Sequence, residues 1–222
     1  ILDAAEIPWM PMRGNHDDHT AFNETFPYSQ FAERSYFGGS YEHEELGKDE
    51  LDCTYWEITA GGRDYLILSL GWAPDQNAIN WADGIIKANP DKNVIITTHA
   101  FMYWDGTHLN DEDLDYTSAY VSSGMDGSEI WEQLGEKNPN VVLAMGGHIG
   151  FPDVIARTDE NGAGREVTSL LCDAQGIDLD YGLGMMMLLT FHENSDQVDI
   201  NWFSTAEGKL FRDRNQFSIT VP

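Results

Sequence analysis

The chain has 222 residues, of which 41% are hydrophobic and 12% aromatic, which indicates one globular domain over residues 1–222 and excludes an intrinsically disordered chain. It carries 38 Asp and Glu against 12 Lys and Arg, for a formal net charge of −26. This charge repels nucleic acid and anionic membranes, so binding of a phosphate backbone by a basic groove is disfavoured. The sequence has no apolar stretch long enough to span a bilayer, and its two cysteines are too few for a disulfide framework.

The first predicted element is a short strand, IPWMPM (Ile7 to Met12), which leads into the polar stretch MRGNHDDH at residues 12–19. In that stretch Asn offers an oxygen ligand, His offers a nitrogen ligand or a proton, and Asp can orient a His. The chain opens without Met, as though cut inside a helix and before this strand. We therefore expect it to be the C-terminal portion of a longer protein, with any targeting segment outside it.

The middle of the chain alternates between strand-like and helix-like segments. TYWEIT and DYLILSL flank the step Gly61-Gly62, which predicts a β-hairpin. DQNAINWADGIIKANP (residues 75–90) has apolar residues at helical spacing and ends in a proline, which predicts a helix. NVIITTH is typical of a strand buried on both faces. GSEIWEQLGEKNPN (127–140) and VVLAMGGH (141–148) repeat this order of helix and strand.

The last third of the chain has a different pattern. Four strand-like runs, PDVIARTD, EVTSLLCD, GMMMLLTFHE and QVDINWFST, follow one another through turns rich in Gly, Asn and Asp. Without helices between them, these runs predict a mostly antiparallel meander. The chain is therefore expected to be α/β over its first two-thirds and β over the remainder.

Three strand-like segments end in a loop that carries a His: IPWMPMRGNHD, NVIITTHA and VVLAMGGHIG. Ligands of open α/β sheets collect beyond the carboxyl ends of the strands, so Asn15, His16, His99 and His148 are expected to converge at one edge. Imidazole nitrogens together with an amide oxygen are typical of a hydrolytic transition-metal centre. Taken singly, Asn15, His99 and His148 are each better explained by a structural role. Taken together, the same context repeated three times favours the metal site.

The other histidines are interpreted more conservatively. A lone His after a strand is more often a structural residue than a ligand, and His43, His108 and His192 are assigned to that class. His19 fits either class. Residues 103–127 form a long polar loop, which could line the mouth of a site or be solvated decoration.

The order Gly14-Asn15-His16-Asp17, then Thr98-His99, then Gly147-His148 resembles the calcineurin-like metallophosphoesterase family. The run DVIARTDENGAGREVTSLLCDAQG and the tail NQFSITV are similar to the secreted bacterial branch of that family, which implies an extracellular or cell-surface location. The resemblance covers nearly the whole chain. It implies a four-layer αββα sandwich with two central mixed β-sheets, here lacking its N-terminal strands.

By position, the resemblance implies that Asn15, His99 and His148 hold one of two divalent metal ions, such as Mn, Fe or Zn. His16 would stabilise the transition state or donate a proton to the leaving oxygen, and Asp17 would hydrogen-bond His16 and fix its tautomer. The implied chemistry is in-line attack of an activated water on a small phosphoester substrate, with two cations clamping the attacking and leaving oxygens. The cations would also let an acidic protein take an anionic phosphate.

The chain departs from the family pattern in two places. The family's Asp-x-His and Gly-Asp-x-x-Asp elements, which supply most ligands of the other metal, are not among the residues before Gly14. The family's Gly-His-x-His element is Gly147-His148-Ile149-Gly150 here, and Gly150 has no side chain to bind a metal. Either another residue substitutes, or that metal is weakly held, or this branch manages without it.

The leading hypothesis is a metallophosphoesterase, a hydrolase of phosphate mono- or diesters, whose full-length form completes a site that this chain holds in part. The alternative is a phosphoesterase-like fold with a degraded metal site, acting as a binding or scaffold module. The two departures from the family pattern support that alternative. A carbohydrate-binding β-domain, suggested by seven Trp and nine Tyr, explains none of the His positions.

Overall fold

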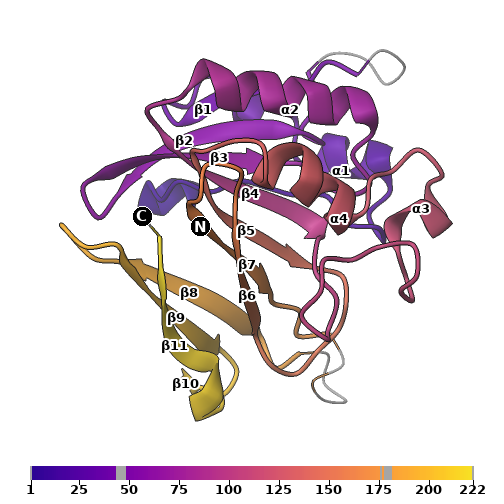
Figure 1. Cartoon of the computed structure of the whole chain (residues 1–222). Helices are drawn as coiled ribbons and strands as arrows, with labels where there is room; N and C mark the ends of the chain where they lie inside the picture. The colour runs from indigo at the N-terminus through magenta and orange to yellow at the C-terminus, as the bar shows by residue number, and fades with distance from the viewer. Residues whose placement is uncertain (1, 44–48, 176, 178–181, 222) are drawn as a thin grey trace.

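The computed structural model describes residues 2–43, 49–175, 177 and 182–221, which form two β-sheets and a set of helices (Figure 1). Seven strands form a large sheet in the order β1-β2-β3-β4-β5-β7-β6. They are β1 (Phe37–Ser40), β2 (Thr54–Ala60), β3 (Arg63–Ser69), β4 (Asn93–Ala100), β5 (Val141–Gly147), β6 (Ile155–Glu160) and β7 (Glu166–Leu171). The small sheet holds β8 (Met185–Phe191), β9 (Gln197–Ser204), β10 (Lys209–Leu210) and β11 (Gln216–Thr220).

The helical elements are short apart from one. They are η1 (Asp3–Ala5), α1 (His19–Thr25), η2 (Tyr28–Gln30), α2 (Gln76–Ala88), α3 (Thr117–Tyr120), α4 (Gly127–Ile130), η3 (Trp131–Gly135) and η4 (Asp213–Asn215). None of the helices in the described part of the chain has the length and apolar character needed to cross a membrane.

The predicted hairpin is confirmed, since β2 and β3 pair antiparallel with Ala60 opposite Arg63. Gly61 and Gly62 have φ angles of 58° and 79°, the left-handed pair that a tight two-residue turn requires. At Gly61 a Cβ would lie 2.9 Å from the His192 carbonyl oxygen. A glycine at this position therefore also lets the hairpin approach the chain that follows β8.

The helix predicted over residues 75–90 is confirmed as α2. Asp75 caps its start by accepting a hydrogen bond from the Ala78 N–H at 2.8 Å. The helix predicted over 127–140 begins as expected with α4 but passes into the π-helical turn η3 and ends at Gly135. It ends early because the Asn138 side chain, at 3.0 Å, donates to the Leu134 carbonyl that a longer helix would have used.

Strands β3, β4, β5 and β7 pair parallel to one another. The β4 and β5 predictions are confirmed, and both strands are buried along most of their length. The expectation of a single antiparallel meander after His148 is wrong for its first half. β7 pairs parallel with β5, and β6 pairs antiparallel with β7, so these two strands extend the large sheet.

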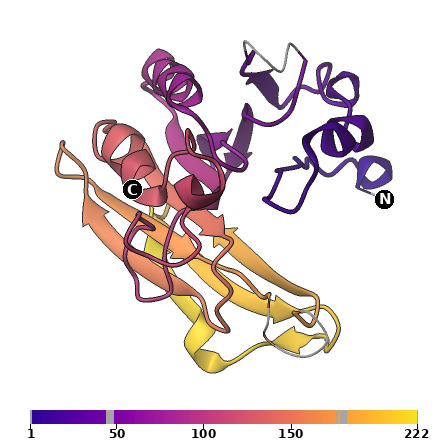
Figure 2. The same cartoon turned by 90° about the vertical axis from the view of Figure 1, so that its right-hand side faces the viewer.

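The small sheet covers the face of the large sheet opposite α2 (Figure 2). Apolar side chains from both sheets form the core between them, among them Tyr65, Val142 and Leu170 from one sheet and Ile200 and Trp202 from the other. The predicted α/β sandwich with two central sheets is confirmed. Within the described residues its helical layer lies over the large sheet, and the strands of the small sheet pair antiparallel.

The strand predicted for Ile7 to Met12 is wrong, because this segment has irregular structure. Pro8 and Pro11 lack the N–H that a strand ladder needs, which explains why the segment joins neither sheet. It is held instead by aromatic packing, with the Trp9 and Phe31 ring centroids 4.8 Å apart. The loop that follows therefore reaches the sheet edge without a strand of its own.

His108 is a core histidine, with 8% of its surface exposed. Its ring stacks on Trp131 with the centroids 5.0 Å apart, and its Nε2 lies 3.3 Å from the Ser169 hydroxyl oxygen. Burial, assisted by the nearby positive charge of Arg157, lowers the pKa of His108 to about 4. The imidazole is therefore neutral in the folded protein at physiological pH.

The lowered pKa of His108 makes the stability of the fold depend on pH. An unfolded His titrates near pH 6.5, so between pH 6.5 and 4 the unfolded chain binds a proton that the folded chain refuses. We expect this group to remove about 2 kcal/mol from the free energy of unfolding between pH 7.5 and pH 5. Urea unfolding at the two pH values measures this fall in the free energy of unfolding. The fall should be smaller by about 2 kcal/mol in His108→Gln than in the wild type, and it should be unchanged in His192→Gln. Equal pH dependence in the wild type and His108→Gln would contradict the assignment.

Candidate metal centre

The carboxyl ends of β4 and β5 bring two of the predicted ligands together. The strands are parallel neighbours, so His99, near the end of β4, and His148, directly after β5, share one edge of the sheet. Their ring centroids lie 5.1 Å apart. His148 has a φ of 67°, a left-handed conformation that is unusual for a residue with a side chain. Such strain is typical of functional sites.

Asn15 reaches the same edge from the loop before α1. Its Oδ1 lies 2.9 Å from Nε2 of His99. A Cβ on the neighbouring Gly14 would lie 3.0 Å from the His99 ring, so the glycine allows the loop to come this close. The structure thus places Asn15, His99 and His148 side by side, as the strand-end argument predicts.

The loop that carries Asn15 is closed by Asp17. Its carboxylate accepts a hydrogen bond from the Gly14 N–H at 2.8 Å, and its own N–H donates to the Gly14 carbonyl at 3.2 Å. The carboxylate is therefore bonded to the loop backbone, and the expected hydrogen bond to His16 is not among the contacts of these two described residues. Both side chains are exposed and close enough to His99 to influence its pKa.

Trp72 and a backbone carbonyl orient the two imidazoles. The Trp72 ring packs against both, with centroid distances of 5.5 Å to His99 and 4.9 Å to His148. Nε2 of His148 lies 2.9 Å from the Asp115 carbonyl oxygen. Since a carbonyl only accepts, this nitrogen carries the proton, which leaves Nδ1 of His148 as the nitrogen with a free lone pair.

Burial makes His99 a neutral base. Burial, together with the neighbouring imidazole of His148 and against the opposing effect of Asp173, lowers the pKa of His99 to about 4. At neutral pH both His99 nitrogens are thus free of positive charge. A neutral imidazole is the form that binds metal ions.

Asp173 is a site residue that the sequence argument missed. It follows β7, which pairs with β5 on the side away from β4, so three consecutive parallel strands end in His99, His148 and Asp173. The three side chains line one cavity of about 520 Å³. The signal for Asp173 is present in the sequence, because EVTSLLCD is a strand-like run that ends in a possible ligand, as the runs before His99 and His148 do. The difference is that this ligand is a carboxylate and not an imidazole.

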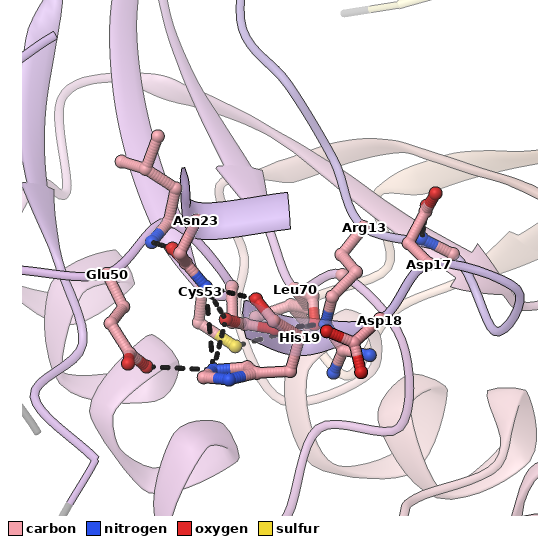
Figure 3. A network of polar contacts seen from close by, with 12 residues as sticks. Arg13, Asp17, Asp18, His19, Asn23, Glu50, Cys53 and Leu70 are labelled. Atoms are coloured by element: carbon pink, nitrogen blue, oxygen red, sulfur yellow. Dashed lines mark hydrogen bonds and ion pairs between the residues drawn. The ribbon is translucent and has the colours of Figure 1, made fainter. Parts of the chain in front are cut away.

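A second polar cluster lies at the start of α1 (Figure 3). Nε2 of His19 is 3.0 Å from a carboxylate oxygen of Glu50 and 3.0 Å from one of Asp52. Ligand atoms of these three residues all lie within 4.8 Å of one another, so the cluster could hold a metal ion. Arg13 forms an ion pair with Asp52, which offsets one of the two negative charges. The cluster is therefore both an ion-pair network and a possible cation site.

The donor atoms fit a divalent cation in both places. Two ligand atoms at right angles on an ion with bonds of about 2.1 Å are separated by about 3.0 Å. Asn15 Oδ1 and His99 Nε2 have nearly this spacing at 2.9 Å, and a cation bound there would take the place of the proton on Nε2, with the imidazole proton on Nδ1 instead. The His19 contacts have the spacing at 3.0 Å. The first pair combines amide oxygen with imidazole nitrogen, and the second combines imidazole with carboxylate.

Comparison with known proteins agrees with the sequence resemblance. A family model described as calcineurin-like phosphoesterase matches residues 2–152, a range that includes Asn15, His16, His99 and His148. An uncharacterized protein of Bacillus subtilis (strain 168), YvnB, is 28% identical over 240 aligned residues. The alignment covers 100% of this chain and 17% of YvnB, so the chain spans only a small part of that relative's length.

Proposed function

Because this chain belongs to the calcineurin-like phosphoesterase family, we propose that it hydrolyses phosphate mono- or diesters at the sheet edge where Asn15, His99 and His148 meet. The family supports metal-dependent phosphoester hydrolysis in general. The observation that carries the proposal for this site is the 2.9 Å contact between Asn15 Oδ1 and His99 Nε2. It joins a loop and a strand 84 residues apart through two atoms of metal-binding type.

The roles of the residues follow from their positions. Two divalent cations, as is usual in phosphoryl transfer of this kind, would neutralise the phosphoryl oxygens and lower the pKa of the attacking water. Asn15, His99 and His148 would hold one of them. Trp72 packs against both imidazole rings and would keep them in place. His16, exposed on the loop that carries Asn15, would approach the leaving oxygen and donate a proton to it.

Asp17 contributes indirectly in this proposal. By accepting the Gly14 N–H it closes the turn from which both Asn15 and His16 project. A fixed turn places the ligand and the proton donor at a constant separation, which catalysis by positioned groups requires. Asp17 is thus a positioning residue that acts through the loop backbone.

Asp173 is the best candidate to replace the side chain that Gly150 lacks. It lies in the same cavity as His99 and His148, and a carboxylate is a common bridging or terminal ligand of hydrolytic metal ions. A histidine could not take the place of Gly150 in this backbone, because a Cβ there would lie 2.7 Å from the Gln175 carbonyl oxygen. In this proposal the replacement ligand comes from the neighbouring strand end, where Asp173 lies.

The proposal is tested by the dependence of phosphoester hydrolysis on metal. The purified protein, loaded with Mn²⁺ or Zn²⁺, should hydrolyse p-nitrophenyl phosphate or its bis-ester, should lose this activity on chelation, and should regain it when the cation is added back. Mass spectrometry of the metal after dialysis should find at least one ion per chain. Asp173→Asn should reduce this content, and Asp213→Asn, an exposed aspartate beyond β10, should not. A chain that binds no cation would contradict the proposal.

A second candidate function, a binding or scaffold module with a degraded centre, is supported by the crowding at Gly150. Such a module would bind the cation and inorganic phosphate but turn nothing over. Isothermal titration with phosphate in the presence of Mn²⁺ separates the two cases. Binding without hydrolysis of either p-nitrophenyl ester favours the module, and hydrolysis excludes it.

A further inference from the structure

A separate cavity of about 300 Å³ opens beside Asn15. Its lining includes Asn15 and Trp72, which belong to the candidate metal centre, and it extends toward the start of α2. Tyr41, Glu50, Asp52 and Asp75 also line it. We call it the acidic cavity. Its position makes it the space next to a phosphate group held at Asn15 and His99.

The described lining of the acidic cavity is negatively charged. It contains the guanidinium of Arg13 and the carboxylates of Glu50, Asp52 and Asp75. The formal charge of the lining is therefore −2 with its histidine, His43, counted as neutral. Arg13 forms its ion pair with Asp52, so the charges of Glu50 and Asp75 are not balanced by Lys or Arg in the lining. A carboxylate oxygen of Glu50 lies 3.0 Å from Nε2 of His19, and a carboxylate oxygen of Asp75 lies 3.6 Å from Nε2 of His43. A second anionic group of a ligand would be repelled here.

The walls and size of the cavity favour a small organic cation. Tyr41 and Trp72 present aromatic surface, on which an ammonium group is attracted by the ring quadrupole. A volume of about 300 Å³ is at the lower end of small-molecule pockets. The space thus suits a compact ammonium group rather than a nucleoside polyphosphate, whose additional phosphates would meet the carboxylates.

We infer that the acidic cavity binds the alcohol part of the phosphoester and that this alcohol carries an ammonium group. The substrate class is then a phosphate mono- or diester of an amino alcohol. This inference rests on the proposed function, because it places the phosphate at Asn15 and His99 and the cation between Glu50, Asp75 and the aromatic walls. The metal centre would attract the anionic end of such a substrate, and the cavity its cationic end.

Binding of the alcohol alone tests the cavity independently of catalysis. Choline and its neutral isostere 3,3-dimethylbutanol are titrated into the full chain at 0.15 M salt, and binding is followed by calorimetry and by tryptophan fluorescence. We expect choline to bind at least tenfold more tightly than the neutral isostere. Equal affinity for the two alcohols would overturn the inference.

Two variants assign the preference to the cavity rather than to the overall charge. Glu50→Gln removes a cavity charge, and Asp75→Asn is a second variant that keeps the capping of α2. Each should reduce the preference for choline at least threefold. Glu160→Gln removes the same charge from β6, at the opposite edge of the large sheet from β1, and should leave the preference unchanged. A preference unaffected by both cavity variants would also overturn the inference.

Kinetics separate failure of the inference from failure of the proposed function. Choline phosphate should be hydrolysed with a kcat/KM at least tenfold above that of 3,3-dimethylbutyl phosphate. Hydrolysis of p-nitrophenyl phosphate without this preference would overturn the cavity inference and leave the proposed function standing. Preferential binding of choline without hydrolysis of any ester would support the cavity and overturn the proposed function.

Discussion

His16→Ala lowers the turnover of an alkyl phosphate by about 10²–10⁴-fold, the usual contribution of a general acid, and leaves the cation content unchanged. The reason lies in the position of the side chain. His16 is exposed, and the contact that joins the loop to β4 is made by Asn15. Its removal therefore takes away a proton donor without disturbing a ligand. The measurement is kcat with the metal-loaded protein, together with metal content by mass spectrometry.

The leaving group shows which role His16 has. An alkoxide needs a proton as it leaves, whereas p-nitrophenolate is stable without one, so the loss should be much smaller for p-nitrophenyl phosphate than for the alkyl ester. His192→Ala is the matched control, since this histidine pairs with Asp199 on the small sheet. An equal loss for both esters would show that His16 stabilises the phosphoryl group and does not donate a proton.

The sheet and its ligands could be predicted from the sequence where the pattern is local. β4 and β5 are recognisable as buried runs, and the carboxyl ends of parallel neighbours necessarily share an edge. His99 and His148 were therefore found together without knowledge of the fold. The hairpin was equally accessible, because Gly61-Gly62 allows the left-handed turn that joins β2 to β3.

Other features depend on contacts that local patterns do not contain. Pro8 and Pro11 interrupt an apolar run that otherwise resembles a strand, and the N–H groups that they lack outweigh the apolar pattern. The parallel pairing of β7 with β5 depends on long-range contacts, and an antiparallel meander does not include it. Asp173 was missed for the same reason, since its place beside His148 follows only from that pairing.

The ion-pair cluster at the start of α1 could not be predicted from the sequence either. His19 meets Glu50 and Asp52 across separations of more than thirty residues, and part of the intervening chain forms β1. The sequence leaves the class of His19 open, because no local pattern indicates that these two distant carboxylates meet it. The structure supplies two, and Arg13 shares one of them.

The second large effect concerns metal binding. His99→Phe keeps an aromatic ring against Trp72 but removes both nitrogens, so the packing is preserved while the ligand is lost. Loss of a residue that merely orients a metal ligand weakens binding 10–100-fold, so loss of the ligand itself should weaken Mn²⁺ or Zn²⁺ binding at least 100-fold. Hydrolysis should fall in proportion to the metal lost. Isothermal titration with the metal alone measures the affinity.

His108→Phe is the matched control for this variant. His108 is buried and His99 is partly buried, both have a pKa lowered to about 4, and both pack against a tryptophan. They differ in what lies beside them, since His99 contacts Asn15 and His148 whereas His108 contacts Ser169. If affinity depends on the ligand set and not on buried histidines in general, only His99→Phe loses the cation. Equal metal affinity of His99→Phe and His108→Phe would show that the metal centre is not at the edge of β4. The cluster of His19, Glu50 and Asp52 would then be the site to test.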